Sequence, residues 1–316
     1  MKLLLTGAFS YDRDQVNKLE ELGFTVSFME KEWEALPVPP EEVEVVVCNG
    51  LFLYHDISLF GNLKAIHVTS AGTDRLPLEV IRERRIRLFR ADGVYSAPIA
   101  EWVVLRLLEI YKNSRHFDRL QQDRRWEKQT DLLELTGKKA AILGYGSIGK
   151  EVAKRLGAFG VHVTGVGRQG KAVPEGVGAY VGMDRIGDVL QESDIVIVTL
   201  PLSAETKHLL DAEKLGMMKQ DSVLIHVSRG GIVDEEALYE KVRDGKFLGV
   251  ALDVFEEEPL PDGSPFWERE DVFITPHNSF VSDQTKERLF DLLFRNLALL
   301  SKEQEFYRNG FKARSH

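Results

Sequence analysis

Three residues that could support proton transfer and anion binding stand behind apolar runs in the second half of the 316-residue chain. Arg229 follows "VLIHVS", Glu258 lies in "GVALDVFEEEPL", and His277 follows "VFITP". An arginine can hold a carboxylate and polarise a carbonyl, and a histidine can give a proton to the carbonyl oxygen. A carboxylate beside the histidine favours its protonated form and fixes its ring. From the residues alone, Glu256 and Glu257 compete with Glu258 for that role.

Each of these side chains also has an ordinary structural explanation. Arg229 suits a helix cap or a surface ion pair, His277 a satisfied loop histidine, and Glu258 a solvated charge. Their shared position behind strands favours the catalytic interpretation, because ligands of open α/β sheets collect outside the carboxyl ends of the strands.

A glycine-rich turn lies upstream of this set. In "KKAAILGYGSIGKEVAKRL", Gly144, Gly146 and Gly149 have GxGxxG spacing between an apolar run and an amphipathic helical pattern. The first glycine permits a tight turn, the second lets backbone approach a pyrophosphate, and the third lets the helix pack on the strand. Three glycines also mark plain strand-to-helix turns, but the order strand, loop, helix, strand predicts dinucleotide binding.

The second strand of this unit ends in Gly167-Arg168-Gln169 instead of the usual acid. An acid at that point binds the adenosine ribose and repels a 2′-phosphate, whereas an arginine pairs with the phosphate. The sequence therefore favours NADP(H). If Arg168 is only a surface residue on a loop that lacks the acid, NAD(H) is the alternative.

Short apolar runs alternate with helical patterns along the chain, which is typical of parallel sheets covered on both faces. We predict an α/β protein with strands at 2–6, 25–28, 43–48, 65–68 and 87–89, and then at 139–143, 161–166, 195–200, 222–227, 248–254 and 272–275. An amphipathic helix over 283–306 closes the pattern. A further helix over 97–115 is apolar on most faces, so it must be buried on most faces, within the chain or against another subunit.

Composition excludes several classes of function. A net charge of -9 argues against nucleic acid as a partner. The single Cys48 rules out a disulfide framework, and the chain has no CxxC or HExxH for a metal. No apolar stretch is long enough for a membrane helix. We therefore predict a cytoplasmic protein that binds no metal.

Together with a nicotinamide, the arginine, histidine and carboxylate support hydride transfer to a 2-keto acid. The chain also resembles the D-isomer-specific 2-hydroxyacid dehydrogenases over nearly its whole length. The resemblance is carried, in this order, by "SAGTDRL", "SAPIAEW", "ILGYGSIG", "DIVIVTLPLSAETKHLL", "VSRGGIVDEEAL", "GVALDVFEEEPL" and "TPHNSF".

The resemblance implies a catalytic set of Arg229, Glu258 and His277, and so selects Glu258 over its acidic neighbours. It places Asp253 near the nicotinamide carboxamide and Pro201 along the cofactor. The substrate-binding residues that it implies are Ser70, Ala71, Gly72, Arg229 and His277. We expect the cofactor to contact Gly144, Tyr145, Gly146, Ser147, Ile148, Gly149, Gly167, Arg168, Gln169, Leu200, Pro201, Thr206, Val227, Ser228 and Asp253.

The family's architecture implies two doubly wound parallel-sheet domains. A Rossmann cofactor domain (99–283) is expected as an insertion in a smaller, flavodoxin-like substrate domain (1–98 and 284–316). Family members are usually dimers joined through the cofactor domain, so we expect a homodimer and assign the apolar helix over 97–115 to its interface.

We predict a reductase that moves hydride from NADPH to a small 2-keto acid and forms a D-2-hydroxy acid. The Gly-Arg-Gln ending resembles the NADPH-using glyoxylate and hydroxypyruvate reductases of the family. His226 and Ser228 stand where family members frequently have asparagine and alanine. This departure bears on the size of the substrate pocket, so the identity of the 2-keto acid is left open. One alternative is NAD-dependent oxidation of 3-phosphoglycerate, which would need further cations such as Arg75. Another is a nucleotide-sensing binding protein like the C-terminal-binding corepressors, although the chain lacks their extended tail.

Overall fold

The computed structural model describes residues 1–168, 173 and 176–312. The chain divides into two compact units. Unit 1 consists of Met1–Tyr95 with Ser282–His316, and unit 2 of Ser96–Val281. The boundaries expected from the sequence, at 98/99 and 283/284, lie three and two residues away from these.

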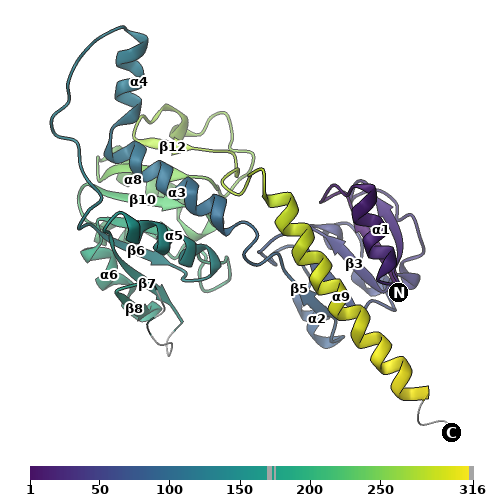
Figure 1. Ribbon diagram of the computed structural model, residues 1–316. Coiled ribbons are helices and arrows are strands. Elements are labelled where there is room, and N and C mark those ends of the chain that lie inside the picture. The colour runs from purple at the N-terminus through teal and green to yellow at the C-terminus, as the bar shows by residue number, and fades with distance from the viewer. Residues whose placement is uncertain (169–172, 174–175, 313–316) are drawn as a thin grey trace. The chain divides into compact units, whose positions relative to one another are not determined.

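Unit 1 is built on a five-stranded parallel sheet in the order β2-β1-β3-β4-β5. This is the strand order of flavodoxin-like folds. The strands are β1 (Lys2–Thr6), β2 (Thr25–Met29), β3 (Val45–Cys48), β4 (Ala65–Val68) and β5 (Arg87–Phe89). The helices are α1 (Arg13–Glu21), α2 (Leu78–Glu83) and α9 (Thr285–Lys312), with the short turns η1 (Pro40–Glu42), η2 (Leu51–Leu53) and η3 (Ile57–Leu59). Figure 1 labels β3 and β5 of this sheet and the helices α1, α2 and α9 of the same unit.

Apolar side chains bury both faces of this sheet. Along β1, Leu3 and Leu5 join a cluster that includes residues of α1 and α9, whereas Leu4 joins the opposite cluster with residues of α2, η2 and η3. Successive side chains of a strand point to opposite faces. A strand with an uninterrupted apolar run is therefore buried on both sides, as the sequence predicted.

Unit 2 is built on a seven-stranded parallel sheet in the order β12-β11-β10-β9-β6-β7-β8. The strands are β6 (Lys139–Leu143), β7 (His162–Gly167), β8 (Ala179–Gly182), β9 (Ile195–Val198), β10 (Ser222–His226), β11 (Phe247–Leu252) and β12 (Val272–Ile274). The chain runs outward from β6 through β7 to β8, then returns to β9 and continues to β12. The strand order thus reverses between β6 and β9, and such a switch point is where doubly wound sheets bind ligands.

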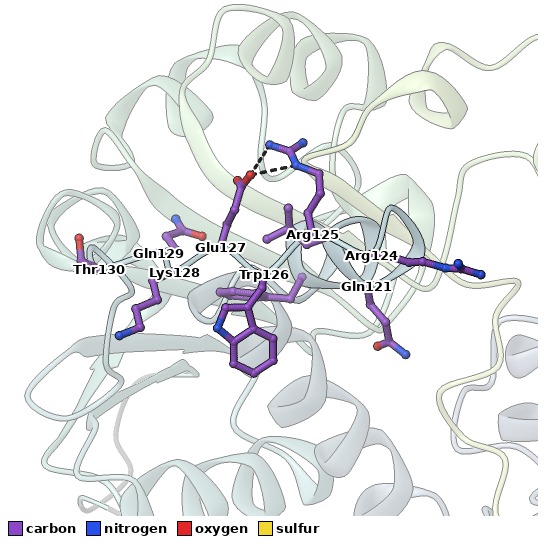
Figure 2. Close-up of a pocket in the computed structure, with 10 residues that line it drawn as sticks. Gln121, Arg124, Arg125, Trp126, Glu127, Lys128, Gln129 and Thr130 are labelled. Atoms are coloured by element: carbon purple, nitrogen blue, oxygen red, sulfur yellow. Dashed lines mark hydrogen bonds and ion pairs between the residues drawn. The ribbon is translucent and has the colours of Figure 1, made fainter.

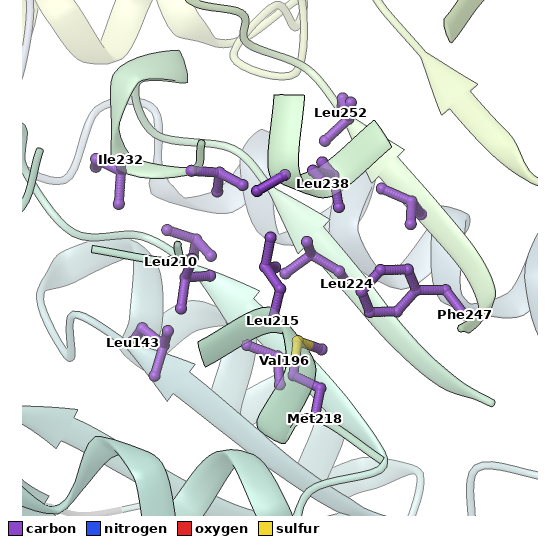
Figure 3. Close-up of a cluster of buried hydrophobic side chains, with 14 of the residues drawn as sticks. Leu143, Val196, Leu210, Leu215, Met218, Leu224, Ile232, Leu238, Phe247 and Leu252 are labelled. Carbon is purple, nitrogen blue, oxygen red and sulfur yellow. The ribbon is translucent and has the colours of Figure 1, made fainter. Parts of the chain in front are cut away.

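Helices cover both faces of the second sheet. They are α3 (Ser96–Tyr111), α4 (Ser114–Gln122), α5 (Ser147–Ala158), α6 (Ile186–Glu192), α7 (Ala212–Met217) and α8 (Glu235–Arg243), with η4 (Met183–Arg185), η5 (Gly230–Ile232) and η6 (Pro265–Glu268). Figure 3 shows the apolar cluster between the strands and α7 and α8, where Leu224 and Leu252 lie near Leu215 and Leu238. On the other face α3 packs against α5, β10 and β11.

The predicted α/β architecture of two doubly wound parallel sheets is confirmed. The single helix expected over 97–115 is wrong, because the chain breaks between α3 and α4 where Asn113 has a left-handed φ of 49°. The sequence also gave no sign of β8, which has only four residues, none of them buried. Within the described residues, no helix is long and apolar enough to cross a membrane.

Candidate active site

The three glycines of the loop after β6 meet three different constraints. Gly144 has a φ of +99°, and a Cβ there would lie 2.7 Å from the backbone nitrogen of Leu200. A Cβ on Gly149 would lie 2.9 Å from the carbonyl oxygen of Gly144, so this glycine lets α5 approach the loop. A Cβ on Gly146 would meet nothing within 4 Å. The open side of the loop at Gly146 is therefore where a pyrophosphate can approach the backbone.

The first turn of α5 faces this open side. Gly146 is the N-cap and provides no side-chain acceptor for the helix N–H groups. Gly146 and Ser147 are exposed and Ile148 is half-buried. Thr199, after β9, steadies the turn by donating its hydroxyl to the carbonyl oxygen of Gly144 at 2.6 Å. The unpaired N–H groups and the helix dipole suit an anion.

Arg168 directly follows β7 and is exposed. Tyr180 of β8 donates its hydroxyl to the carbonyl oxygen of Arg168 at 3.4 Å, and its ring meets that of Tyr145 edge-on at 6.2 Å. Tyr180 was missed by the sequence analysis because β8 was missed. Gln169, also expected to contact the cofactor, lies outside the described residues.

The remaining predicted cofactor residues, apart from Asp253, follow β9 and β10. Leu200, Val227 and Ser228 are buried. The hydroxyl of Thr206 donates to the carbonyl oxygen of Pro201 at 2.7 Å and accepts the N–H of Ser203 at 2.8 Å. The hydroxyl of Thr206 thus stabilises the loop between Pro201 and Thr206.

His277 and Glu258 form a direct pair. Nδ1 of His277 lies 2.8 Å from Oε2 of Glu258, and Oε1 of Glu258 accepts the N–H of Phe255 at 3.1 Å. The two side chains are 33% and 38% exposed, so both are accessible to a ligand. With Nδ1 engaged by the carboxylate, Nε2 of the imidazole is available for proton transfer.

Asp253 holds the loop that carries His277. Its carboxylate is wholly buried and accepts the hydroxyl of Thr275 at 2.6 Å, the N–H of Asn278 at 2.8 Å and the N–H of Ser279 at 3.0 Å. The carbonyl oxygen of Asp253 also accepts the N–H of His277 at 2.8 Å. These bonds fix His277 in a left-handed conformation with a φ of 50°. Asp253 therefore supports the histidine, a role that the sequence did not reveal.

Arg229 lies on a loop fixed by a buried histidine. Nε2 of His226 lies 2.9 Å from the carbonyl oxygen of Arg229, and burial lowers the pKa of His226 to about 4. Nη1 of Arg229 donates to the carbonyl oxygen of Ser228 at 2.8 Å. His226 is therefore neutral at pH 7 and acts on the shape of the arginine loop.

Gly230 brings the arginine loop against the loop after β11, which carries Glu258. A Cβ on Gly230 would lie 1.9 Å from the carbonyl carbon of Phe255. On the loop after β11, the N–H of Glu256 donates to the carboxylate of Glu235. Burial, together with the nearby charges of Glu256 and Glu258, raises the pKa of Glu235. Gly230 and Glu235 are further supports of the site that sequence reasoning missed, because their roles depend on contacts distant in the chain.

The predicted residues for the substrate carboxylate lie in unit 1, after β4. Ser70 donates its hydroxyl to the carbonyl oxygen of Gly72 at 2.8 Å, and Ala71 and Gly72 are half-buried. The structure thus groups Arg229, Glu258, His277 and Asp253 within unit 2, and Ser70–Gly72 within unit 1.

Known proteins are similar to this chain in sequence and in fold. The NAD-binding domain of D-isomer specific 2-hydroxyacid dehydrogenases matches residues 104–279. A glyoxylate reductase from Thermofilum pendens is 32% identical over 246 residues, which cover 76% of this chain and 73% of that protein. A hydroxypyruvate reductase from Thermotoga maritima is 31% identical over 288 residues, 89% of this chain and 92% of that protein. The chain belongs to the D-isomer specific 2-hydroxyacid dehydrogenase family.

A solved family structure agrees in fold. The D-isomer specific 2-hydroxyacid dehydrogenase from Xanthobacter autotrophicus, in complex with NADPH and MES, is 29% identical and covers 94% of each chain with a TM-score of 0.77. The chain described in this article is thus an oxidoreductase that transfers hydride between a nicotinamide cofactor and a 2-keto or 2-hydroxy acid. The family and the reaction class predicted from the sequence are confirmed.

Proposed function

We propose that this dehydrogenase works as an NADPH-dependent reductase of a small 2-keto acid and forms the D-2-hydroxy acid. The observation that carries the proposal is the His277–Glu258 pair at 2.8 Å, on loops that follow two neighbouring strands of the nucleotide-binding sheet. Relatives named glyoxylate reductase and hydroxypyruvate reductase support the substrate class.

A bound nicotinamide cofactor would supply the hydride, and the open glycine loop, the uncapped start of α5 and Arg168 suit its phosphates. Arg229 holds the substrate carboxylate and polarises the C2 carbonyl. His277, oriented through Nδ1 by Glu258, donates a proton from Nε2 to the carbonyl oxygen, and in the opposite direction it accepts that proton. The family resemblance also assigns the backbone of Ala71 and Gly72 to the substrate carboxylate.

The decisive assay is a matrix of NADPH and NADH against glyoxylate, hydroxypyruvate, pyruvate and bulkier 2-keto acids. We expect reduction of at least one small acid, with a higher kcat/KM for NADPH. If both cofactors bind tightly and no acid is reduced, the catalytic proposal fails and a nucleotide-sensing role takes its place.

Arg168 carries the NADPH preference in this proposal. Its side chain is exposed directly behind β7, where a guanidinium can pair with a 2′-phosphate. Arg168→Ala should raise the Kd for NADPH by about 10-fold or more, as expected for loss of a charge-assisted pair, and leave the Kd for NADH nearly unchanged. Arg185→Ala, which removes another exposed arginine of unit 2, is the control. Equal effects on both cofactors would contradict the assignment.

We also propose a homodimer formed through unit 2. Leu105 of α3 is 48% exposed and Trp126, in the loop after α4, is 96% exposed. Trp126 borders a hollow of about 760 Å³ that is lined by residues of α4 and of this loop (Figure 2). Sedimentation of Trp126→Asp should show a monomer, whereas Trp33→Asp, at an exposed tryptophan of unit 1, should stay dimeric. A wild-type monomer would refute the proposal.

The cellular compartment is proposed from the cysteine content. The single cysteine, Cys48, is free and buried, which fits a reducing compartment. We therefore place the enzyme in the cytoplasm, which fractionation of cells that express a tagged chain would test.

A further inference from the structure

Two glycines leave one face of β7 without side chains near the carboxyl end of the strand. Gly165 and Gly167 are two residues apart, so a side chain on either would point to the same face of the sheet. Gly167 is also the last residue of β7. A dinucleotide-binding unit usually carries at this place the acid that binds the adenosine ribose. The group that covers this face therefore lies where the adenosine ribose is expected.

The side chain of Tyr180 covers both glycines. Tyr180 of β8 is the register partner of Gly165. A Cβ on Gly165 would lie 3.0 Å from Cδ2 of Tyr180, and a Cβ on Gly167 would lie 2.3 Å from the hydroxyl oxygen of the same tyrosine. The ring of Tyr145, from the glycine loop, meets the ring of Tyr180 edge-on with the centroids 6.2 Å apart. Tyr180 thus lies along β7 and carries its hydroxyl to the carboxyl end of the strand.

This hydroxyl stands in the place of the usual acid. By standard bond lengths, an aspartate at position 167 would hold its carboxylate oxygens about 2.4 Å from its own Cβ. The hydroxyl oxygen of Tyr180 lies 2.3 Å from that Cβ position. It is therefore as far from the backbone of Gly167 as an aspartate carboxylate would be.

The hydroxyl of Tyr180 is held only weakly by the protein. It donates to the carbonyl oxygen of Arg168 at 3.4 Å, whereas about 2.7–2.8 Å is usual for a hydroxyl donor. The side chain of Tyr180 is half-buried and that of Arg168 is exposed. A charged ligand oxygen at the end of β7 makes a stronger acceptor than this carbonyl group and can take over the proton of the hydroxyl.

We propose that the Tyr180 hydroxyl binds the 2′-phosphate of NADPH, beside the guanidinium of Arg168. A tyrosine hydroxyl is a neutral donor, so it attracts the phosphate oxygen that an acid would repel. The same atom fills the space above Gly167, so an acidic side chain fits there only if the tyrosine moves. Both effects favour NADPH over NADH. The inference rests on the proposed function, because it takes NADPH as the cofactor.

Removal of the hydroxyl tests the proposal directly. Tyr180→Phe keeps the ring over Gly165 and removes only the donor. Titration without substrate should show a Kd for NADPH raised by about 10-fold, whereas the Kd for NADH should change by less than about 3-fold. Tyr239→Phe, the same change at another half-buried tyrosine of unit 2, should leave both Kd values unchanged.

Gly167→Ala tests whether the hydroxyl occupies the place of the acid. In the wild-type background the new Cβ would displace the hydroxyl, so the Kd for NADPH should rise by about 10-fold, as in Tyr180→Phe. In the Tyr180→Phe background the nearest ring carbon, Cζ, is 3.2 Å from that Cβ. The second change should then raise the Kd by less than about 3-fold, because residues in direct contact have effects that do not add.

The outcomes distinguish this inference from the proposed function. If Tyr180→Phe keeps the wild-type ratio of the two Kd values while Arg168→Ala changes it, the NADPH preference stands and the role of Tyr180 is wrong. Equal weakening of NADPH and NADH by Tyr180→Phe would make the tyrosine a structural support only. Additive effects of Gly167→Ala and Tyr180→Phe would contradict their shared position. A wild-type enzyme that binds NADH as tightly as NADPH refutes the NADPH preference itself, and this inference with it.

Discussion

Replacement of Asp253 should loosen the loop that carries His277. The carboxylate is wholly buried and accepts hydrogen bonds from Thr275, Asn278 and Ser279. Asp253→Ala leaves these three donors unpaired. At about 1–2 kcal/mol for each donor left unpaired, the change should destabilise unit 2 by about 3–6 kcal/mol.

Asp253→Asn provides a graded comparison. Oδ1 of Asp253 accepts from all three donors, whereas Oδ2 accepts only from Ser279, at 3.0 Å. The asparagine oxygen can therefore take the place of Oδ1, and its amide nitrogen then faces the N–H of Ser279. We expect a loss of about 1–2 kcal/mol, clearly smaller than that of the alanine variant.

Unfolding and turnover are to be measured on the same preparations. Three of the four tryptophans, Trp102, Trp126 and Trp267, lie in unit 2, so tryptophan fluorescence in urea reports mainly on that unit. Displacement of His277 by even 1 Å should lower kcat/KM by about 100-fold in the alanine variant. Glu257→Ala, which removes an exposed carboxylate from the loop after β11, is the control.

A different pattern would refute this reasoning. The family resemblance places Asp253 near the nicotinamide carboxamide, whereas both of its oxygens accept hydrogen bonds from the His277 loop. If Asp253→Ala leaves stability unchanged and raises the Kd for the cofactor by about 100-fold, a loss of about 2.7 kcal/mol, the residue acts on the nicotinamide and the loop account is wrong.

Other predictions follow from buried groups and glycines. Gly230→Ala should yield no soluble or active enzyme, because its Cβ would lie 1.9 Å from the carbonyl carbon of Phe255. Gly231→Ala is the control, and it should resemble wild type in expression and turnover. Its Cβ would meet only the methyl groups of Leu202, at 3.7 and 3.8 Å. Burial lowers the pKa of His67 and of His226 from 6.5 to about 4, so the unfolded chain binds protons that the folded one does not as pH falls from about 6.5 to 4. Each of the two histidines should then lower the free energy of unfolding by up to about 3 kcal/mol as the pH falls. Equal free energies of unfolding in urea at pH 7 and at pH 5 would contradict this expectation. Gly146→Ala should fold normally but bind cofactor more weakly in fluorescence titration, because its Cβ meets no protein atom within 4 Å; unchanged affinity would place the pyrophosphate elsewhere.

The sheets were predictable because their strands are short apolar runs buried on both faces. All eleven predicted strands begin or end within one residue of the observed bounds at one end or both, whereas β8 was missed because it is four residues long and none of them is buried. The break between α3 and α4 was missed because no proline or glycine marks it in the sequence, whereas a left-handed Asn113 separates the two helices.

The residue pattern predicted Arg229 and His277 as reactive groups and the family resemblance selected Glu258, but neither revealed the residues that support them. Arg229, Glu258 and His277 stand behind strands and carry recognisable chemistry. Asp253 and Gly230 act through backbone contacts with residues that are distant in the chain, and no local pattern shows such contacts.

The central claim is that His277, oriented by Glu258, exchanges the proton with the substrate oxygen. The most direct test is the rate of NADPH oxidation by His277→Ala with the best 2-keto acid, together with the Kd for NADPH. Loss of a general acid typically lowers turnover by about 10²- to 10⁴-fold, and we predict such a loss with a Kd for NADPH within about 3-fold of wild type. Turnover near the wild-type rate would contradict the account.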